Sequence, residues 1–165
     1  MSGDPVHHVE LNVNGEPYRA TAADRQLLVH FLRDTLALKG THIGCDSGNC
    51  GACTIRCEGK LVKSCMMLAV QADGCDLRTV EGLTGLHGEL TPLQRAFKEH
   101  HALQCGYCTP GVLMSAEYLL ERNPVPSEEE VRRALKGNLC RCTGYVNIVA
   151  AIMATAEELG RGGRP

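Results

Sequence analysis

Four cysteines in the first half of the chain have a spacing that suits an inorganic cluster. Cys45, Cys50, Cys53 and Cys65 are separated by four, two and eleven residues. This is the C-x4-C-x2-C…C spacing of a plant-type [2Fe-2S] centre, in which thiolates surround a compact iron-sulfide core. The spacing therefore predicts a site that holds such a core and passes single electrons.

Four cysteines in the second half form another group. Cys105 and Cys108 enclose two residues, and Cys140 and Cys142 enclose one. We interpret them as ligands of a second [2Fe-2S] cluster, so that the chain relays electrons between two centres. Tetrahedral zinc is an alternative for this group alone, because zinc also accepts two close pairs of cysteines. A redox-active dithiol is disfavoured, since no βαβ pattern surrounds Cys105 and Cys108.

Hydrogen-bond donors are expected around both groups, because a reduced cluster carries net negative charge. Gly44, Gly48 and Gly51 alternate with the first three cysteines, and glycine lets backbone amides approach sulfur closely. Thr109 is expected to cap a helix whose positive end faces the second group. Arg141 either adds positive charge there or is a solvated surface charge.

The composition limits the class of protein. The formal net charge is -2 with a pI near 6.4, and aromatic residues make up 4% of the chain. Neither charge attraction nor base stacking therefore favours a nucleic-acid partner. No apolar run approaches the roughly 18 residues of a membrane span, and no secretory signal pattern is visible. We expect a cytoplasmic protein whose grouped thiols bind metal rather than form disulfides.

The first half predicts an α+β module of the β-grasp, ferredoxin-like kind. Alternating apolar residues at 9–13 and the return segment at 16–20 flank Asn14-Gly15, which is typical of a β-hairpin turn. Apolar residues at helical spacing predict a helix over 25–38. Three further strands are expected, over 53–57, 60–64 and 75–80.

The second half predicts a four-helix module. Thr91 followed by Pro92 is a typical helix start, and Ser127 with Glu130 forms a capping box. The four helices are expected to end near residues 100, 122, 135 and 159. We place a ferredoxin-like domain at 1–82, a glycine-rich linker at 83–90, a helical [2Fe-2S]-binding domain at 91–160 and a frayed tail at 161–165.

Two cysteines and three methionines are left outside these groups. Cys57 and Cys75 fall in expected strands, and we interpret them as small buried residues rather than ligands. Met66, Met67 and Met114 are expected to fill the core.

Taken together, the two cysteine motifs make the chain resemble the small iron-sulfur subunit of the xanthine oxidase family of molybdenum hydroxylases. The resemblance extends from about Val9 to Leu159. Within the family, the segment from Cys65 to Gly74 is most similar to aerobic carbon monoxide dehydrogenase small subunits. The motifs that carry the family resemblance are Gly44-Cys45-Asp46, Cys50-Gly51-Ala52-Cys53, Val62-Lys63-Ser64-Cys65, Leu103 to Gly111 and Gly137 to Tyr145.

The resemblance implies partners and a direction for the electrons. Such a subunit joins a large subunit with a molybdenum-pterin cofactor and a medium subunit with FAD, as a dimer of heterotrimers. The resemblance places Gln104 and Cys142 nearest the pterin, so the second cluster is proximal to molybdenum. The first cluster faces the flavin, and this chain itself transforms no substrate.

The substrate of the complex stays open at this point. Carbon monoxide, an N-heteroaromatic ring, a purine and an aldehyde are all compatible with this chain. A freely diffusing two-cluster ferredoxin is a further alternative, but docking of such a carrier favours a strongly charged face. A metal-stabilised binding module without redox function is the third class.

Overall fold

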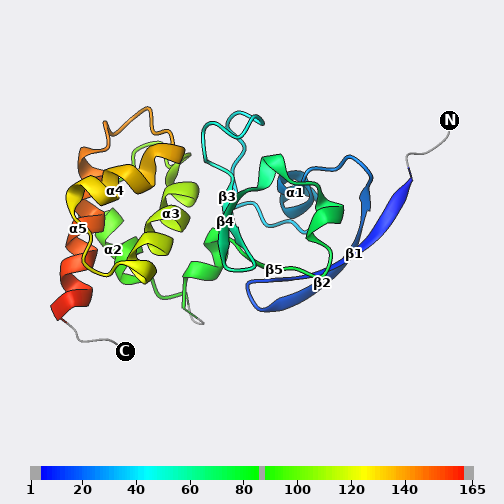
Figure 1. The fold of residues 1–165 in the computed structure, drawn as a ribbon, viewed down its shortest axis with the longest axis horizontal. Coiled ribbons are helices and arrows are strands. Elements are labelled where there is room, and N and C mark those ends of the chain that lie inside the picture. The colour runs from blue at the N-terminus through cyan, green and yellow to red at the C-terminus, as the bar shows by residue number, and fades with distance from the viewer. Residues whose placement is uncertain (1–4, 86–87, 162–165) are drawn as a thin grey trace.

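The computed structural model describes residues 5–85 and 88–161, which form a sheet-containing lobe and a helical lobe (Figure 1). The first lobe contains a mixed five-stranded sheet in the order β2-β1-β5-β3-β4, with only β1 and β5 parallel. This confirms the predicted α+β class. The strands are β1 (Val6–Val13), β2 (Glu16–Ala23), β3 (Thr54–Cys57), β4 (Lys60–Lys63) and β5 (Asp76–Arg78).

The β1-β2 hairpin confirms the predicted turn and extends each strand by three residues. Asn14 and Gly15 have φ values of 56° and 85°, which a two-residue hairpin turn with the twist of its strands requires. Val9, Leu11 and Val13 alternate with exposed residues and are buried in the core. Alternation therefore places one face of β1 against the interior of the lobe.

The helix predicted over 25–38 is much shorter in the structure. An α-helical turn, α1 (Leu28–His30), continues into a π-helix over Phe31–Thr35. The start was wrong because Leu27 is extended and pairs with Leu68. The end was wrong because Ala37 turns the chain at a φ of 59°. The apolar period still identified the buried face correctly, since Leu28, Phe31 and Leu32 are all fully buried.

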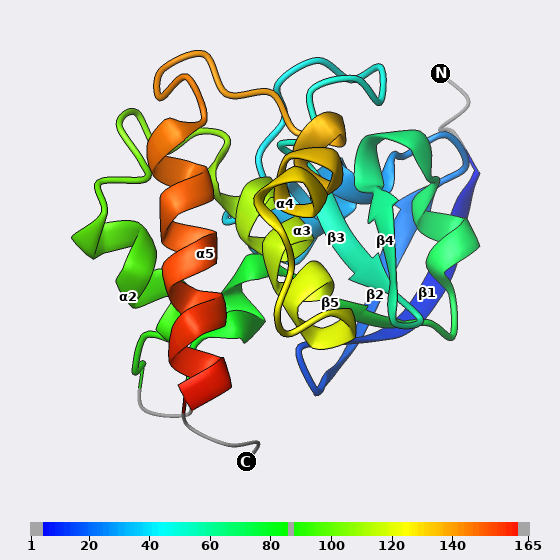
Figure 2. The ribbon, with the colours of Figure 1, turned by 60° about the vertical axis from the view of Figure 1, so that its left-hand side comes forward.

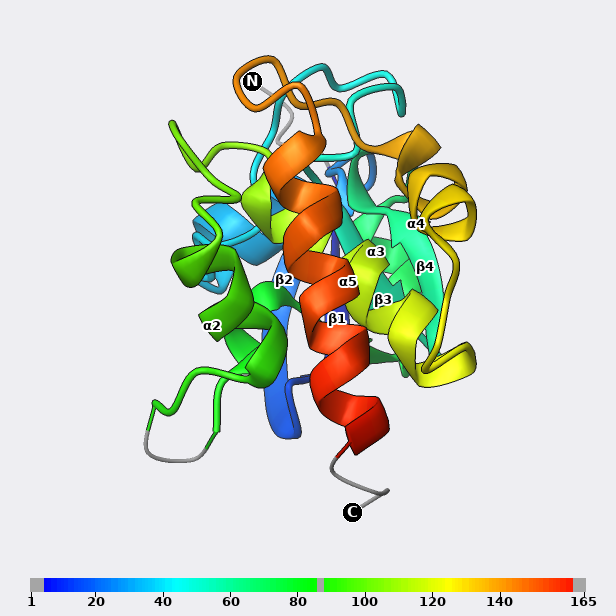
Figure 3. The same cartoon turned by 90° about the vertical axis from the view of Figure 1, so that its left-hand side faces the viewer.

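Four α-helices form the second lobe, as predicted. In Figure 3, α5 lies between α2 and α4, and it contacts both. Figure 2 shows α3 on the side of the lobe that faces the sheet, where it contacts β3. No helix in the described part of the chain is long and apolar enough to cross a membrane. The helices are α2 (Pro92–Glu99), α3 (Thr109–Arg122), α4 (Glu128–Ala134) and α5 (Val146–Arg161).

Helix capping follows the sequence at two of three predicted positions. The hydroxyl of Thr91 accepts from the Gln94 amide, and Ser127 forms the predicted capping box with Glu130. Thr109 does not act as a cap: the structure places Cys108 at the N-cap, and the buried Thr109 hydroxyl has no hydrogen-bond partner. Cys108 already has helical backbone angles, so the helical turn starts one residue before the expected cap.

A short ordered segment leads into the expected linker over 83–90. A 3-10 helix covers Val80–Leu83, and the Glu81 carboxylate accepts from the amide of Gly40 at 2.7 Å and the hydroxyl of Thr79 at 2.6 Å. Residues 86–87 of the expected linker and 162–165 of the expected tail lie outside the described residues. The boundaries at 82, 90 and 160 stay predictions.

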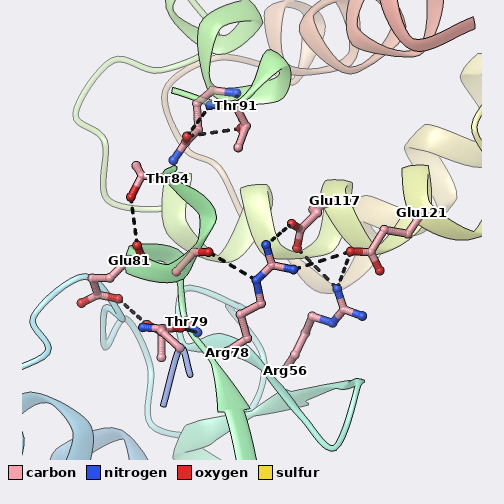
Figure 4. Close-up of polar contacts among 11 residues, drawn as sticks. Arg56, Arg78, Thr79, Glu81, Thr84, Thr91, Glu117 and Glu121 are labelled. Atoms are coloured by element: carbon pink, nitrogen blue, oxygen red, sulfur yellow. Dashed lines mark hydrogen bonds and ion pairs between the residues drawn. The ribbon is translucent and has the colours of Figure 1, made fainter. Parts of the chain in front are cut away.

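A network of ion pairs joins the sheet to α3 (Figure 4). The Arg56 guanidinium lies 2.7 Å from Glu121, and the Arg78 guanidinium lies 3.0 Å from Glu117. Arg56 also lies over the Tyr118 ring, 5.5 Å from its centroid. Burial raises the pKa of Glu117, and the charge of Arg78 opposes this rise. Since Arg56 and Arg78 come from paired strands, the network ties the sheet to α3 at two points.

Candidate functional site

The first group of cysteines lies on an irregular loop and at the end of a strand. Cys45 and Cys50 belong to the loop over 41–53, Cys53 precedes β3, and Cys65 follows β4 in a 3-10 helix. Because β3 and β4 pair antiparallel, Cys53 and Cys65 come together at one end of the hairpin. Both are buried against Val29, whereas Cys45 is exposed.

Backbone amides converge on the first group. The amides of Cys50 and Ser47 donate to the Cys45 sulfur at 3.3 Å and 3.5 Å. The Ser47 hydroxyl and these amides lower the pKa of Cys45 to about 6, so they stabilise negative charge on this sulfur. Burial, followed by the neighbouring Cys53 thiol, raises the pKa of Cys65 to about 11.

The predicted role of glycine is clearest at two positions. A Cβ at Gly44 would lie 2.8 Å from the Cys50 sulfur, so only glycine permits this close approach. Gly48 has a φ of 76°, and its amide lowers the pKa of Cys65 against the larger effect of burial. The loop thus presents main-chain donors to sulfur, as the sequence predicts.

The second group of cysteines is assembled from two loops of the helical lobe. Cys105 and Cys108 lie between α2 and α3, and Cys140 and Cys142 lie between a 3-10 helix over Leu135–Gly137 and α5. The sulfurs of Cys105 and Cys142 are 3.5 Å apart. The Cys108 thiol interacts with the Cys140 thiol, so the cysteines of the two loops pair crosswise.

The second group also contains thiols of contrasting acidity. Burial, with a further effect from Cys140, raises the pKa of Cys108 to about 12. The Tyr107 amide lowers the pKa of Cys105. The pKa of Cys140 is lowered overall, although burial by itself raises it. The Thr143 hydroxyl, 3.1 Å from the Cys140 sulfur, and nearby backbone amides outweigh the effect of burial.

The sulfurs in each group fit the donor set of a binuclear cluster. They occur as two adjacent pairs: Cys45 with Cys50 and Cys53 with Cys65 in the first group, and the two crosswise pairs in the second. A core with two irons takes four thiolates. No three His, Cys, Asp or Glu residues within 5–85 and 88–161 converge on a position for a single metal ion.

The two cysteine loops lie beside each other. In Figures 1, 2 and 3 the loop over 41–53 (cyan) and the loop over 138–145 (orange) lie at the same end of the molecule. The Leu139 amide donates to the Cys50 carbonyl at 2.7 Å. This single hydrogen bond joins a cysteine of the first group to the residue before Cys140 of the second.

An aromatic contact reinforces this junction. The Tyr107 hydroxyl donates to the Ile43 carbonyl at 2.6 Å, and the Tyr107 carbonyl lies 2.9 Å from His42 Nδ1. The rings of His42 and Tyr107 stack with centroids 4.8 Å apart. Tyr107 lies between Cys105 and Cys108 in the sequence, so the contact holds the second group against the first loop.

Asn138 completes the junction, and sequence reasoning missed it. Its side chain is 2% exposed, donates to the Gly51 carbonyl at 3.0 Å and accepts from the Ser115 hydroxyl at 2.8 Å. A Cβ at Gly111 would lie 2.0 Å from the same Gly51 carbonyl oxygen. The signal in the sequence was a polar residue two positions before Cys140, but nothing there indicated its partners.

The residues outside the groups behave in different ways. Cys57 is buried in β3 as expected, whereas Cys75 lies just before β5 and is partly exposed. Met114 is fully buried, but Met66 is 64% exposed and does not fill the core. Met66 lies in the 3-10 helix after Cys65, where its side chain covers Gly48.

Exposed residues surround the second group. Gln104 and Cys142 are both exposed, on the two loops that meet at the Cys105–Cys142 contact. Large apolar side chains nearby are also exposed, and they are Leu103, Tyr107, Leu139 and Val146. Such a patch is typical of a surface that a partner covers.

Two family models match adjacent parts of the chain. The 2Fe-2S iron-sulfur cluster binding domain matches residues 11–78, and the [2Fe-2S] binding domain matches residues 79–153. The chain therefore carries two [2Fe-2S] clusters in two different folds, which decides against zinc for the second group. The fold and the site define a two-cluster iron-sulfur protein.

Known proteins resemble the chain over nearly its whole length. The nicotine 6-hydroxylase small subunit of Paenarthrobacter nicotinovorans is 51% identical, over 92% of this chain and 91% of that protein. Caffeine dehydrogenase subunit gamma of Pseudomonas sp. (strain CBB1) is 50% identical, over 93% of this chain and 98% of that protein. A chain in the structure of quinoline 2-oxidoreductase from Pseudomonas putida 86 is 47% identical. It superimposes with a TM-score of 0.90, over 95% of this chain and 98% of that one.

These similarities identify the family to which the chain belongs. It belongs to the small iron-sulfur subunits of the xanthine oxidase family of molybdenum hydroxylases, and is thus a subunit of an oxidoreductase. The narrower resemblance to carbon monoxide dehydrogenase subunits stays a prediction.

Proposed function

We propose that the chain relays single electrons through two clusters held by its eight grouped cysteines. A [2Fe-2S] core accepts and returns one electron at a time. The observation that carries the proposal is the 2.7 Å hydrogen bond from the Leu139 amide to the Cys50 carbonyl, which keeps the two groups adjacent. The proposed ligands are Cys45, Cys50, Cys53 and Cys65 for the first cluster, and Cys105, Cys108, Cys140 and Cys142 for the second.

Electrons enter at the second group and leave from the first in this proposal. Gln104 and Cys142 contact the pterin of the molybdenum cofactor, and their exposure on adjoining loops supports such a contact. Cys45 is the exposed member of the first group, which supports transfer from there to a flavin. The amides of Ser47 and Cys50 stabilise the negative charge that an arriving electron adds at Cys45.

The proposed partners are a large molybdenum-pterin subunit and a medium FAD subunit, in a dimer of heterotrimers. The exposed apolar residues around the second group support a covering partner, since Leu139 is 58% and Val146 is 65% exposed. A near-neutral chain lacks the strong charge with which a diffusing ferredoxin is steered to its partners. We place the complex in the cytoplasm, where thiols stay reduced.

An N-heteroaromatic compound is the substrate class that we propose for the complex. Two relatives that are 50–51% identical are named for nicotine and caffeine, and the structural relative is named for quinoline. All three compounds contain a nitrogen heterocycle. The segment Cys65–Gly74 supports carbon monoxide as a second candidate, through its resemblance to the corresponding segment of carbon monoxide dehydrogenases.

Electron paramagnetic resonance of the purified complex with Cys50→Ser tests the ligand assignment. We expect loss of one of two reducible [2Fe-2S] signals and retention of the other. The matched control is Cys57→Ser, which changes a buried cysteine outside both groups and leaves both signals in place.

Three results would contradict the proposal. Zinc in place of iron, or no acid-labile sulfide, would contradict the presence of the clusters. Equal loss of both signals in Cys50→Ser would contradict separate ligand sets. Isolation of the chain without larger subunits, when it is expressed from its native gene neighbourhood, would contradict the proposed complex.

A further inference from the structure

Lys63 carries a positive charge into the junction between the lobes. It is the last residue of β4 and is partly buried. Its ammonium donates to the Thr54 hydroxyl at 2.8 Å and to the Gly137 carbonyl at 2.8 Å. Both acceptors are neutral, so neither compensates the charge of Lys63.

No carboxylate forms an ion pair with Lys63 among the residues that the structure describes. The exposed Lys39, in contrast, pairs with Asp34 at 3.2 Å. Withdrawing an ammonium from water without an opposite charge is costly. The location of Lys63 therefore indicates that negative charge is supplied by something other than a carboxylate.

The nearest source of negative charge is the first cysteine group. A Cβ at Gly51, which lies between Cys50 and Cys53, would be 2.9 Å from the Lys63 nitrogen. Lys63 also lies two residues before Cys65, and its acceptor Thr54 directly follows Cys53. The ammonium thus lies beside residues that flank three ligands of the first group, whereas its contact in the helical lobe, Gly137, is three residues before Cys140.

We propose that Lys63 is the charge partner of the first cluster and makes it the better electron acceptor of the two. This inference rests on the proposed function and deepens it. One electron leaves the second cluster, which is oxidised, and enters the first, which is reduced; no bond changes and no proton moves. Lys63 stabilises the added negative charge at the first group more than at the second, and so favours transfer outward.

The expected size of the effect follows from Coulomb's law. At an effective dielectric constant of about 20, a unit charge within about 12 Å favours a one-electron reduction by about tenfold. The contact with Gly51 places the ammonium inside that range of the first group. A tenfold change in the equilibrium constant of a one-electron couple corresponds to a shift of about 59 mV in its reduction potential.

Redox titration of the purified complex, followed by electron paramagnetic resonance, tests the inference. In Lys63→Met we expect the reduction equilibrium of the first cluster to become about tenfold less favourable. The reduction potential of the second cluster should shift by less. Lys63→Arg keeps the positive charge, so the first cluster should still have the higher reduction potential of the two. Lys60→Met removes an equal charge from the exposed start of the same strand and leaves both potentials near those of the parent.

Unchanged potentials in Lys63→Met, or equal shifts of both clusters, would overturn the inference and leave Lys63 as a structural contact only. If Lys63→Met does not assemble, Lys63→Gln keeps a hydrogen-bond donor without the charge and is judged by the same criteria. Failure of the proposed function is distinguishable, because it would be seen as missing cluster signals in the parent complex.

Discussion

Replacing Asn138 by alanine tests how the two lobes are held together. The side chain is buried and bridges three segments, because it donates to Gly51 of the first cysteine loop and accepts from Ser115 of α3. Alanine removes both of these hydrogen bonds, together with a long one of 3.5 Å to the Thr54 hydroxyl, and leaves a void. The Gly51 carbonyl keeps its bonds from Thr54, so the loss is limited to the contacts of Asn138 itself.

The magnitude follows from these contacts. Each hydrogen bond contributes about 1 kcal/mol net, and the void adds about 1 kcal/mol, so the free energy of unfolding falls by about 3 kcal/mol. For a chain of this size, 1 kcal/mol corresponds to about 2–4 °C in melting temperature. We therefore expect Asn138→Ala to lose its visible cluster absorption about 6–12 °C below the parent, at a fixed heating rate without oxygen.

The matched control is Asn147→Ala. Asn147 is exposed and donates to the His101 carbonyl at 3.2 Å on the surface, so its loss costs less than about 0.5 kcal/mol. A melting temperature for Asn138→Ala as high as that of Asn147→Ala would refute the view that a buried amide fastens the lobes.

Two further predictions concern the reactivity of a thiol and the closeness of two backbones. Burial, followed by the nearby Cys75 thiol, raises the pKa of Cys57 to about 11, so iodoacetamide should not label it in the native complex at pH 8. Labelling should rise, and folding stability fall, as the pH increases towards 11, because ionisation is easier in the unfolded chain; rapid labelling at pH 8, detected by mass spectrometry, would contradict this. Gly111→Ala should lower the free energy of unfolding by about 2 kcal/mol, because its Cβ would meet the Gly51 carbonyl at 2.0 Å. Gly160→Ala, with open space around it, should be neutral or slightly stabilising in the same thermal assay, and equal stability of the two variants would argue against the close contact.

Local patterns in the sequence predicted most of the secondary structure. The Asn14-Gly15 turn, the helix start at Thr91 and the capping box at Ser127 depend on neighbouring residues, so they were predicted correctly. The start of the helix over 25–38 was wrong because Leu27 pairs with Leu68, which is remote in sequence, and its end was wrong because Ala37 turns the chain. Hydrophobic periodicity identifies a buried face but contains no information about such a bridge.

The candidate site was predictable in composition but not in arrangement. The spacing of the cysteines revealed two groups, because cluster ligation requires particular residues at short intervals. The contacts between the groups come from tertiary packing. Lys63 and Asn138 each form a hydrogen bond with a segment more than 70 residues away, so no local pattern in the sequence could assign these contacts.

The contact between Gly51 and Gly111 has a consequence for the speed of the relay. Main chain meets main chain there, without an intervening side chain whose rotamer could alter the spacing. The spacing between the first cysteine loop and α3 is consequently set at this point by the packing of two backbones. With the two lobes held in this way, the proposed electron relay requires no hinge opening, and its rate should be insensitive to the viscosity of the solvent.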